Sequence, residues 1–295
     1  MKKLVLFLLI FAVSCGTTEN IKVISVKPSY KGQIENAKWN SSFSVEISSQ
    51  EKINLLIYFP SKFEIGRPLK TLIVLHDQNQ DNREWSRNSR IVKFAEQYNV
   101  VLVCPQMKNS IYSRAYFPET SAKWASVPGA VFIGENLVAY LRETLGLAAA
   151  RNLTSVIGIG GGAHGAVRCG ELYPDKIGGI AALSGFYDFL VMTRDKRISS
   201  VYGDFKNFKD RWEAENILSQ ADRLADSRMI IIHGGKDAYF PITHARMLAI
   251  KIRSLEKSNP GKYRNKYVEK ASGRHDWAFW NSQLETVFEF LYTEI

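Results

Sequence analysis

The strongest constraint on the fold is a repeated alternation of apolar, β-branched segments with segments of helical spacing. The apolar, strand-like segments lie at 71–76, 100–104, 154–160, 177–183, 229–233 and 266–269. Helical spacing covers about 86–98, 131–145, 161–173, 243–255 and 277–292. Continuous apolar strands are typical of a parallel sheet that is buried on both faces. The pattern therefore predicts an α/β fold with a mostly parallel central sheet flanked by helices.

Two segments depart from this alternation. Residues 42–47 and 53–59 favour an antiparallel pair of strands that opens the sheet. Residues 186–227 mix aromatic and charged side chains and indicate a small helical insertion. Because ligands of doubly wound sheets bind at the carboxyl ends of the strands, we expect this insertion to form one wall of a pocket there.

The N-terminus has the features of a secretory signal. Two lysines precede a short apolar core, which is too short to span a bilayer. Ala12-Val13-Ser14-Cys15-Gly16 resembles the lipobox of bacterial lipoproteins, with Ala12 in place of the usual leucine. We expect a signal peptide at 1–14, a lipidated tether with a first strand at 15–40 and one domain at 41–295. Lipidated Cys15 would anchor the chain to the cell envelope, in the outer membrane rather than the inner; the alternative is an ordinary signal peptide that leaves a free cysteine.

Composition excludes several classes of partner and cofactor. The formal net charge is +10, but lysine and arginine are spread along the chain without the dense run that nucleic-acid binding favours. Cys104 and Cys169 lie in a strand and a helix, which favours buried free thiols over a disulfide framework. The five histidines form no ligand cluster, so neither a metal nor a cofactor is implied.

A glycine-dense turn joins the strand at 154–160 to the following helix, with the sequence Gly158-Ile159-Gly160-Gly161-Gly162. A strand, a tight turn and a helix are the context of a nucleophile elbow, whose tip projects a side chain above the sheet. The tip here is Gly160, so the attacking oxygen is missing. Because the tip conformation costs a non-glycine residue about 1–3 kcal/mol, glycine should relax the turn while the fold survives.

Two further positions complete a constellation with Gly160. Asp237 follows the apolar strand at 229–233, and His275 lies in the loop after the last strand. The chain order of tip, acid and histidine is that of α/β-hydrolases. A carboxylate placed in this way can orient an imidazole. Asp237 and His275 are therefore predicted to be a residual acid and base beside a vacant nucleophile position.

The chain resembles the esterase D and S-formylglutathione hydrolase group of esterases, which includes feruloyl esterase domains. In that family the elbow reads Gly-x-Ser-Met-Gly-Gly-His-Gly-Ala, and this chain has Gly-Ile-Gly-Gly-Gly-Ala-His-Gly-Ala at 158–166. The likeness covers about 45–295 and includes the segments 171–175, 182–185, 202–204 and 275–277. It implies an α/β-hydrolase fold, with Gly160 at the serine position and with Asp237 and His275 as acid and base.

A second departure from the family lies at the oxyanion hole, which we assign to Asp77, Gln78 and Gly161. The family shows His-Gly after the third strand, whereas this chain has His76-Asp77-Gln78. A carboxylate beside a developing oxyanion opposes it, and losing one donor costs about 2.7–4 kcal/mol of barrier stabilisation. Two separate defects therefore predict impaired serine esterase chemistry.

Three functions are compatible with these features of the sequence. The preferred one is an envelope lipoprotein whose esterase-like domain binds an acyl-ester or glycan ligand, or a partner; in its simplest version the pocket is vestigial. The alternative is an active ester hydrolase with another nucleophile, or with water activated by Asp237 and His275. Gly158-x-Gly160-x-x-Ala163 also fits a dinucleotide fingerprint, but the next strand ends at Leu183-Ser184 without the acidic residue that this motif needs. The sequence leaves the oligomeric state open.

Overall fold

The computed structural model describes residues 34–48, 51–64, 69–124 and 126–293. Within these residues eight strands form one sheet, and only the pairs β1–β2 and β2–β4 are antiparallel. In sheet order the strands are β1 (Lys38–Glu46), β2 (Lys52–Phe59), β4 (Val100–Pro105), β3 (Lys70–Leu75), β5 (Thr154–Ile159), β6 (Gly179–Leu183), β7 (Arg228–Gly234) and β8 (Arg264–Lys270). The mostly parallel sheet and its antiparallel opening pair are confirmed. The first strand begins at Lys38, ahead of the predicted boundary at 41.

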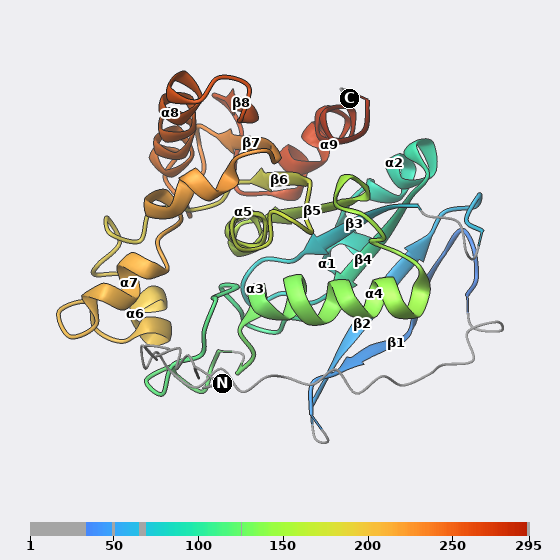
Figure 1. The fold of residues 1–295 in the computed structure, drawn as a ribbon, viewed down its shortest axis with the longest axis horizontal. Helices are drawn as coiled ribbons and strands as arrows, with labels where there is room; N and C mark the ends of the chain where they lie inside the picture. Colours follow the sequence, from blue (N-terminus) through green and yellow to red (C-terminus); the bar gives the residue numbers. More distant parts are fainter. Residues whose placement is uncertain (1–33, 49–50, 65–68, 125, 294–295) are drawn as a thin grey trace, which may run out of the picture.

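Helices cover both faces of the sheet (Figure 1). One face carries α3 (Gly129–Val131), the π-helical turn η2 (Phe132–Leu137), α4 (Val138–Leu145), α5 (Gly161–Leu172) and α8 (Thr243–Ser258). The other face carries α1 (Glu84–Asn88), α2 (Ile91–Tyr98) and α9 (Trp277–Tyr292). Strands β4, β5 and β6 are buried along their whole length, because helices press on them from both sides. This explains their continuous apolar sequences.

The helix expected at 86–98 is divided into α1 and α2. Ser89 lies at the break with extended backbone, and its hydroxyl donates to the Trp85 carbonyl at 2.6 Å. The same hydroxyl accepts the Ile91 N–H at 3.3 Å. A serine side chain that bonds to nearby backbone groups competes with helical hydrogen bonds, which explains the interruption.

The segment 186–227 is a helical insertion, as predicted. It contains α6 (Lys196–Tyr202), α7 (Lys209–Ala214) and the 3-10 helix η4 (Ile217–Leu224). Helices α6 and α7 lie together at one side of the molecule (Figure 1). They surround a separate apolar cluster built from Ile111, Phe186, Phe189, Ile198, Val201, Tyr202, Trp212 and Phe240. The insertion therefore has its own small core beside the carboxyl ends of the strands.

Several expectations concern the ends of the chain and the cysteines. Cys15, the lipobox and the strand-like piece at 21–26 lie outside the described residues. Cys104 and Cys169 are buried free thiols, as expected. None of the helices in the described part of the chain combines the length and apolar character needed to cross a membrane.

Candidate functional site

The turn between β5 and α5 has the backbone of a nucleophile elbow, although its tip is Gly160. This residue has φ of 53° and ψ of −118°, a conformation that L side chains rarely adopt. Glycine reaches it with little penalty, so the strain expected of a serine is absent while the shape of the turn is kept. The Gly160 N–H donates to the Leu183 carbonyl at 3.0 Å, which ties the tip to β6.

The glycines on either side are required by close backbone approach. A Cβ on Gly158 would lie 1.9 Å from the Gly162 carbonyl oxygen, and a Cβ on Gly162 would lie 2.6 Å from the Leu75 carbonyl oxygen. Both distances are far below a normal contact. The Gly-x-Gly-x-Gly spacing therefore serves the packing of α5 against β5 and the end of β3.

The carboxylate of Asp77, which follows β3, occupies the space in front of the tip. A Cβ built on Gly160 would lie 2.3 Å from both Cγ and Oδ1 of Asp77, and 2.4 Å from Oδ2. A serine side chain at the tip and the Asp77 carboxylate in its present position cannot coexist. Sequence reasoning placed Asp77 near the elbow but did not predict that it fills the place of the missing side chain.

The same carboxylate accepts the hydrogen bonds of the predicted oxyanion hole. Oδ1 of Asp77 accepts the Gly161 N–H at 2.6 Å and the Gln78 N–H at 2.7 Å. Gly161 is the first residue of α5, where unpaired N–H groups and the helix dipole favour an anion. The Asp77 carboxylate therefore lies in the predicted oxyanion hole itself, on the N–H groups that would bind an oxyanion.

The loop that carries Asp77 is held in place by hydrogen bonds from the preceding residue. The buried imidazole of His76 bonds through Nδ1 to the Asp77 carbonyl at 2.8 Å and accepts the Met107 N–H through Nε2 at 3.1 Å. The hydroxyl of Tyr112 donates to the His76 carbonyl at 2.9 Å. These contacts fix the direction of the backbone at the end of β3, and with it the position of the Asp77 carboxylate.

His275 lies between two carboxylates. Its Nδ1 is 2.8 Å from Oδ2 of Asp237, and its Nε2 is 3.2 Å from Oδ2 of Asp77. Burial alone would lower the pKa of His275, but the hydrogen bonds to Asp237 and Asp77, together with both charges, raise the pKa to about 9. At neutral pH the ring is therefore an imidazolium that donates to both acids.

The Asp237 side chain has no exposed surface, and it has more partners than His275. Its Oδ1 accepts the N–H groups of Tyr239 and Phe240, each at 2.9 Å. Burial alone would raise the pKa of Asp237, but the bonds from His275 and Phe240 outweigh burial and lower it. His233 lies 3.5 Å from Asp237 and was missed by sequence reasoning. The available signal was a polar residue at the end of an otherwise apolar strand.

Aromatic rings surround the imidazole of His275. The ring centroids of Tyr239, Phe240 and Trp280 lie 4.9, 5.5 and 5.0 Å from it. Tyr239 is exposed, whereas Phe240 and Trp280 are buried. The site is thus closed beneath His275 and open toward Tyr239. The exposed fraction of the Asp77 side chain is 20%, so solvent reaches its carboxylate.

Other side chains near the elbow are poorly placed to replace the serine. His164 is buried and stacked on Phe186, and burial lowers its pKa well below the usual value, as suits a packed residue. The hydroxyl of Ser184 is buried and accepts the Trp280 indole N–H. Burial raises the pKa of Cys169, which keeps it a neutral thiol. The structure therefore brings together Gly160, Gly161, Asp77, Gln78, Asp237 and His275, and none of the other candidates joins them.

The chain is similar in sequence or in fold to several known proteins. An acetyl esterase of Caldicellulosiruptor saccharolyticus is 25% identical over 235 residues, covering 76% of this chain and 83% of the acetyl esterase. Among solved structures, MPT51 (FbpC1) of Mycobacterium tuberculosis aligns with a TM-score of 0.69 at 17% identity, covering 88% of this chain and 99% of MPT51. An S-formylglutathione hydrolase from Agrobacterium tumefaciens gives a TM-score of 0.66 at 15% identity, with the same coverage of both chains.

These likenesses confirm the α/β-hydrolase fold that the sequence predicts. Residues 47–291 match the family described as Putative esterase, which spans the sheet from β2 to β8 and includes the elbow, Asp237 and His275. The match covers most of the chain. The chain therefore belongs to the Putative esterase family.

Proposed function

We propose that this chain is a lipid-anchored envelope protein whose esterase-like domain binds an acyl-ester or glycan ligand and does not perform serine ester hydrolysis. The observation that carries the proposal is the position of the Asp77 carboxylate, in the space of the missing serine side chain and on the donors of the oxyanion hole. The lipid anchor at Cys15 is inferred from the signal-like N-terminus and its lipobox.

Three elements of serine chemistry are blocked together in this arrangement. Gly160 has no hydroxyl to attack an ester. The N–H groups of Gly161 and Gln78 already bond to Asp77, and removing a single such donor costs about 2.7–4 kcal/mol of barrier stabilisation in enzymes that use one. With a pKa of about 9, His275 is protonated at neutral pH and cannot accept a proton as a general base.

The binding part of the proposal depends on two groups near Asp77 and His275, the amide of Gln78 and the ring of Tyr239. The side-chain amide nitrogen of Gln78 is buried beside Gly161 and has no hydrogen-bond partner among the described residues. Tyr239 exposes most of its ring beside His275. The exposed Tyr239 ring suits contact with a ligand, and the unpaired Gln78 amide would bond to a carbonyl or hydroxyl group of that ligand if its side chain turned out of its buried position.

The proposal is tested with a fluorophosphonate probe and p-nitrophenyl acetate. We expect neither an adduct nor turnover with the wild type. Gly160→Ser alone should give little activity, because its Cβ meets the Asp77 carboxylate. Gly160→Ser with Asp77→Gly should give clearly more of both signals, since the hole and the space in front of the tip are then free.

The control is the triple variant that adds His275→Ala to this pair, which should lose the gained turnover. Hydrolysis by the wild type that disappears in His275→Ala would instead establish the alternative, an active hydrolase using another nucleophile or activated water. Labelling of the membrane fraction with radioactive palmitate, lost in Cys15→Ser, tests the anchor.

A further inference from the structure

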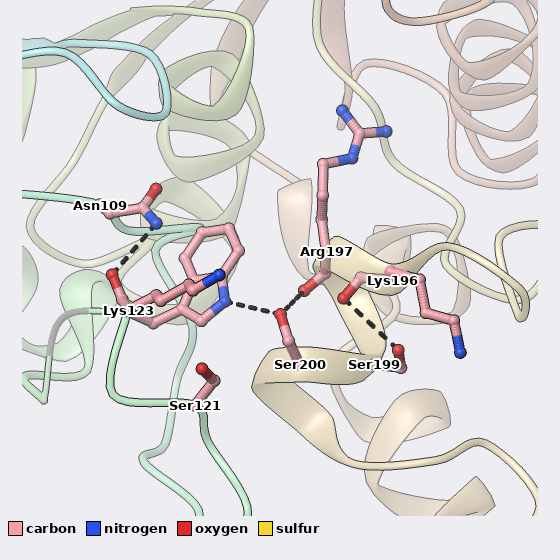
Figure 2. Close-up of a pocket in the computed structure, with 8 residues that line it drawn as sticks. Asn109, Ser121, Lys123, Lys196, Arg197, Ser199 and Ser200 are labelled. Carbon is pink, nitrogen blue, oxygen red and sulfur yellow. Dashed lines mark hydrogen bonds between the residues drawn. The ribbon is translucent and has the colours of Figure 1, made fainter.

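A pocket of about 470 Å³ lies beside the insertion, apart from the elbow. Figure 2 shows its two walls: Asn109, Ser121 and Lys123 come from the segment between β4 and α3, and they face residues of α6. The lining residues are Asn109, Ser121, Lys123, Trp124, Lys196, Arg197, Ser199 and Ser200. The volume is in the range of small-ligand sites, about 300–1,000 Å³.

The lining is positively charged. Lys123, Lys196 and Arg197 contribute three cations, and the lining includes no acid. Arg197 is paired with Asp195, which accepts from Nε at 3.1 Å and from Nη2 at 2.6 Å. Lys123 and Lys196 are exposed, and neither ammonium group forms an ion pair with another described residue. The lining therefore carries two lysines without an ionic partner among the described residues, and in Figure 2 the ammonium of Lys196 points away from Lys123.

The indole of Trp124 is held rigidly in the lining. Its Nε1–H donates to the Ser200 hydroxyl at 2.7 Å, and that hydroxyl donates to the Arg197 carbonyl at 2.8 Å. The backbone N–H of Ser121 donates to the Ser200 carbonyl at 2.8 Å, so the two walls are bonded to each other. A fixed aromatic ring provides flat apolar surface without the entropic cost of ordering it on binding.

Neutral polar groups complete the lining. Ser121 and Ser199 contribute hydroxyls, and Asn109 donates from Nδ2 to the Lys123 carbonyl at 3.2 Å. The other amide atom of Asn109, Oδ1, has no hydrogen-bond partner among the described residues. Hydroxyls, an amide and an indole suit a sugar ring, which has apolar C–H faces and a rim of hydroxyl groups.

The pocket adjoins the site at His275 through one aromatic ring. The Arg197 guanidinium lies 5.0 Å from the centroid of the Phe240 ring, and that ring lies 5.5 Å from the ring of His275. The hydrogen bond to Asp195 raises the pKa of Arg197 and burial lowers it; the charges of Asp195 and, to a smaller extent, of Asp77 raise it further. A ligand in this pocket would be separated from His275 by Arg197 and the Phe240 ring.

We propose that this pocket binds an anionic saccharide, that is, a sugar carrying a carboxylate or phosphate group. Lys123 would contact the anionic group, the exposed Lys196 side chain would turn toward it from the other wall, and Trp124 would pack on the face of the sugar ring. This inference rests on the proposed binding function and narrows its glycan ligand to an acidic one.

The test is calorimetric titration of the purified protein with three probes: trigalacturonate, glucose 6-phosphate and neutral maltotriose. We expect one of the two acidic probes to bind, and the comparison between them shows whether carboxylate or phosphate is preferred. Its affinity should fall steeply between about 50 and 500 mM NaCl, because salt screens exposed charges. Maltotriose should bind much more weakly than that acidic probe.

Two variants assign the binding to this pocket. The double variant Lys123→Ala with Lys196→Ala should lower the affinity for the acidic probe about tenfold. The matched control is Lys251→Ala with Lys257→Ala, which removes the same charge from the exposed surface of α8 and should leave the affinity unchanged. Trp124→Ala should lower the affinity for the acidic saccharide but leave the salt dependence of that affinity unchanged. The unfolding temperature of each variant shows whether it is folded.

If the pocket variant and the α8 control variant lost the same amount of affinity, the probe would be attracted only by the net charge of the protein, and the inference would be overturned. Maltotriose binding as tightly as the acidic probes would also overturn it, while leaving a glycan-binding function in place. AMP, which carries an aromatic base beside its ribose phosphate, should bind no better than glucose 6-phosphate; clearly tighter binding of AMP would indicate a nucleotide site and would overturn the inference. If p-nitrophenyl acetate stabilises the protein and all three saccharides fail, this inference is wrong and the proposed function survives through its acyl-ester arm.

Discussion

Two places in this molecule set one cation between two carboxylates, and their surroundings differ. At the elbow, the His275 imidazole bonds to Asp237 and to the partly exposed Asp77. Beneath the insertion, the Arg168 guanidinium bonds to Glu171 at 2.7 Å and lies 3.9 Å from the carboxylate of Glu215. The side chains of Arg168 and Glu171 have no exposed surface.

The different surroundings explain why the Arg168 cluster serves the structure whereas the His275 cluster is a candidate functional site. Arg168 cannot lose its proton, so the cation of this cluster is permanent, and it ties α5 to the insertion through the Glu215 backbone carbonyl. Burial raises the pKa of Glu171 to about 7, although Arg168 acts in the opposite direction. His275 can titrate, faces solvent through Asp77 and lies at the carboxyl ends of the strands, where ligands of this kind of sheet bind. Only the second cluster combines access with an adjustable charge.

The largest expected effect is at the buried cluster. Arg168→Met should destabilise the protein by about 3–5 kcal/mol, because it leaves two buried carboxylates without their cation. Urea unfolding followed by circular dichroism measures this as a lower midpoint at unchanged slope. A loss below about 1 kcal/mol in the free energy of unfolding would show that Glu171 and Glu215 are already neutral. The Arg168 cluster would then not depend on its cation, contrary to what its geometry indicates.

The elbow cluster should make stability depend on pH. The pKa of His275 is about 9 in the folded protein, against about 6.5 for an unperturbed histidine. Its stabilisation is therefore fully present below pH 6.5 and is lost as the pH rises through 9, by up to about 3 kcal/mol. Urea unfolding of the wild type and of His275→Gln across this range should show a steeper decline for the wild type. Parallel curves would contradict the two-carboxylate environment.

Crowding at the elbow tip predicts a coupled pair of substitutions. Gly160→Ala should destabilise the protein by about 2 kcal/mol, because alanine meets both the unfavourable φ and the Asp77 carboxylate. Adding Asp77→Gly removes the steric contribution to this loss of stability. The double variant should therefore be more stable than the sum of the losses in the two single variants predicts. A double-mutant cycle measures that coupling, and strict additivity would show that Asp77 does not fill the space in front of Gly160.

The smallest effect serves as the baseline for both clusters. Lys209 and Glu213 form an exposed pair one helical turn apart on α7, at 3.4 Å. Lys209→Ala should cost about 0.3–0.5 kcal/mol, because solvent screens such a pair. A loss as large as that of Arg168→Met would mean that α7 is held mainly by this pair rather than by Trp212 and the aromatic cluster.

Much of the fold followed from periodicity. The apolar strands, the order of β and α elements, the helical insertion and the final helix at 277–292 were all predicted from patterns that burial imposes on a chain. The break at Ser89 was not, because a serine hydroxyl can bond either to water or to the backbone, and the sequence does not show which. The Arg168 cluster was also not foreseen, since Glu215 is far from Arg168 and Glu171 in the chain and meets them only after the insertion folds.

The sequence by itself determined that the tip of the elbow has no side-chain oxygen, because residue 160 is a glycine. It also located Asp237 and His275, because each follows one of two successive strands. Only the tertiary structure decided what Asp77 does. The direction of a short side chain after a strand depends on the loop around it, here fixed by His76, Met107 and Tyr112. A carboxylate moved by a few ångströms either faces solvent or accepts two buried N–H groups, and that choice is made by contacts between residues far apart in the chain.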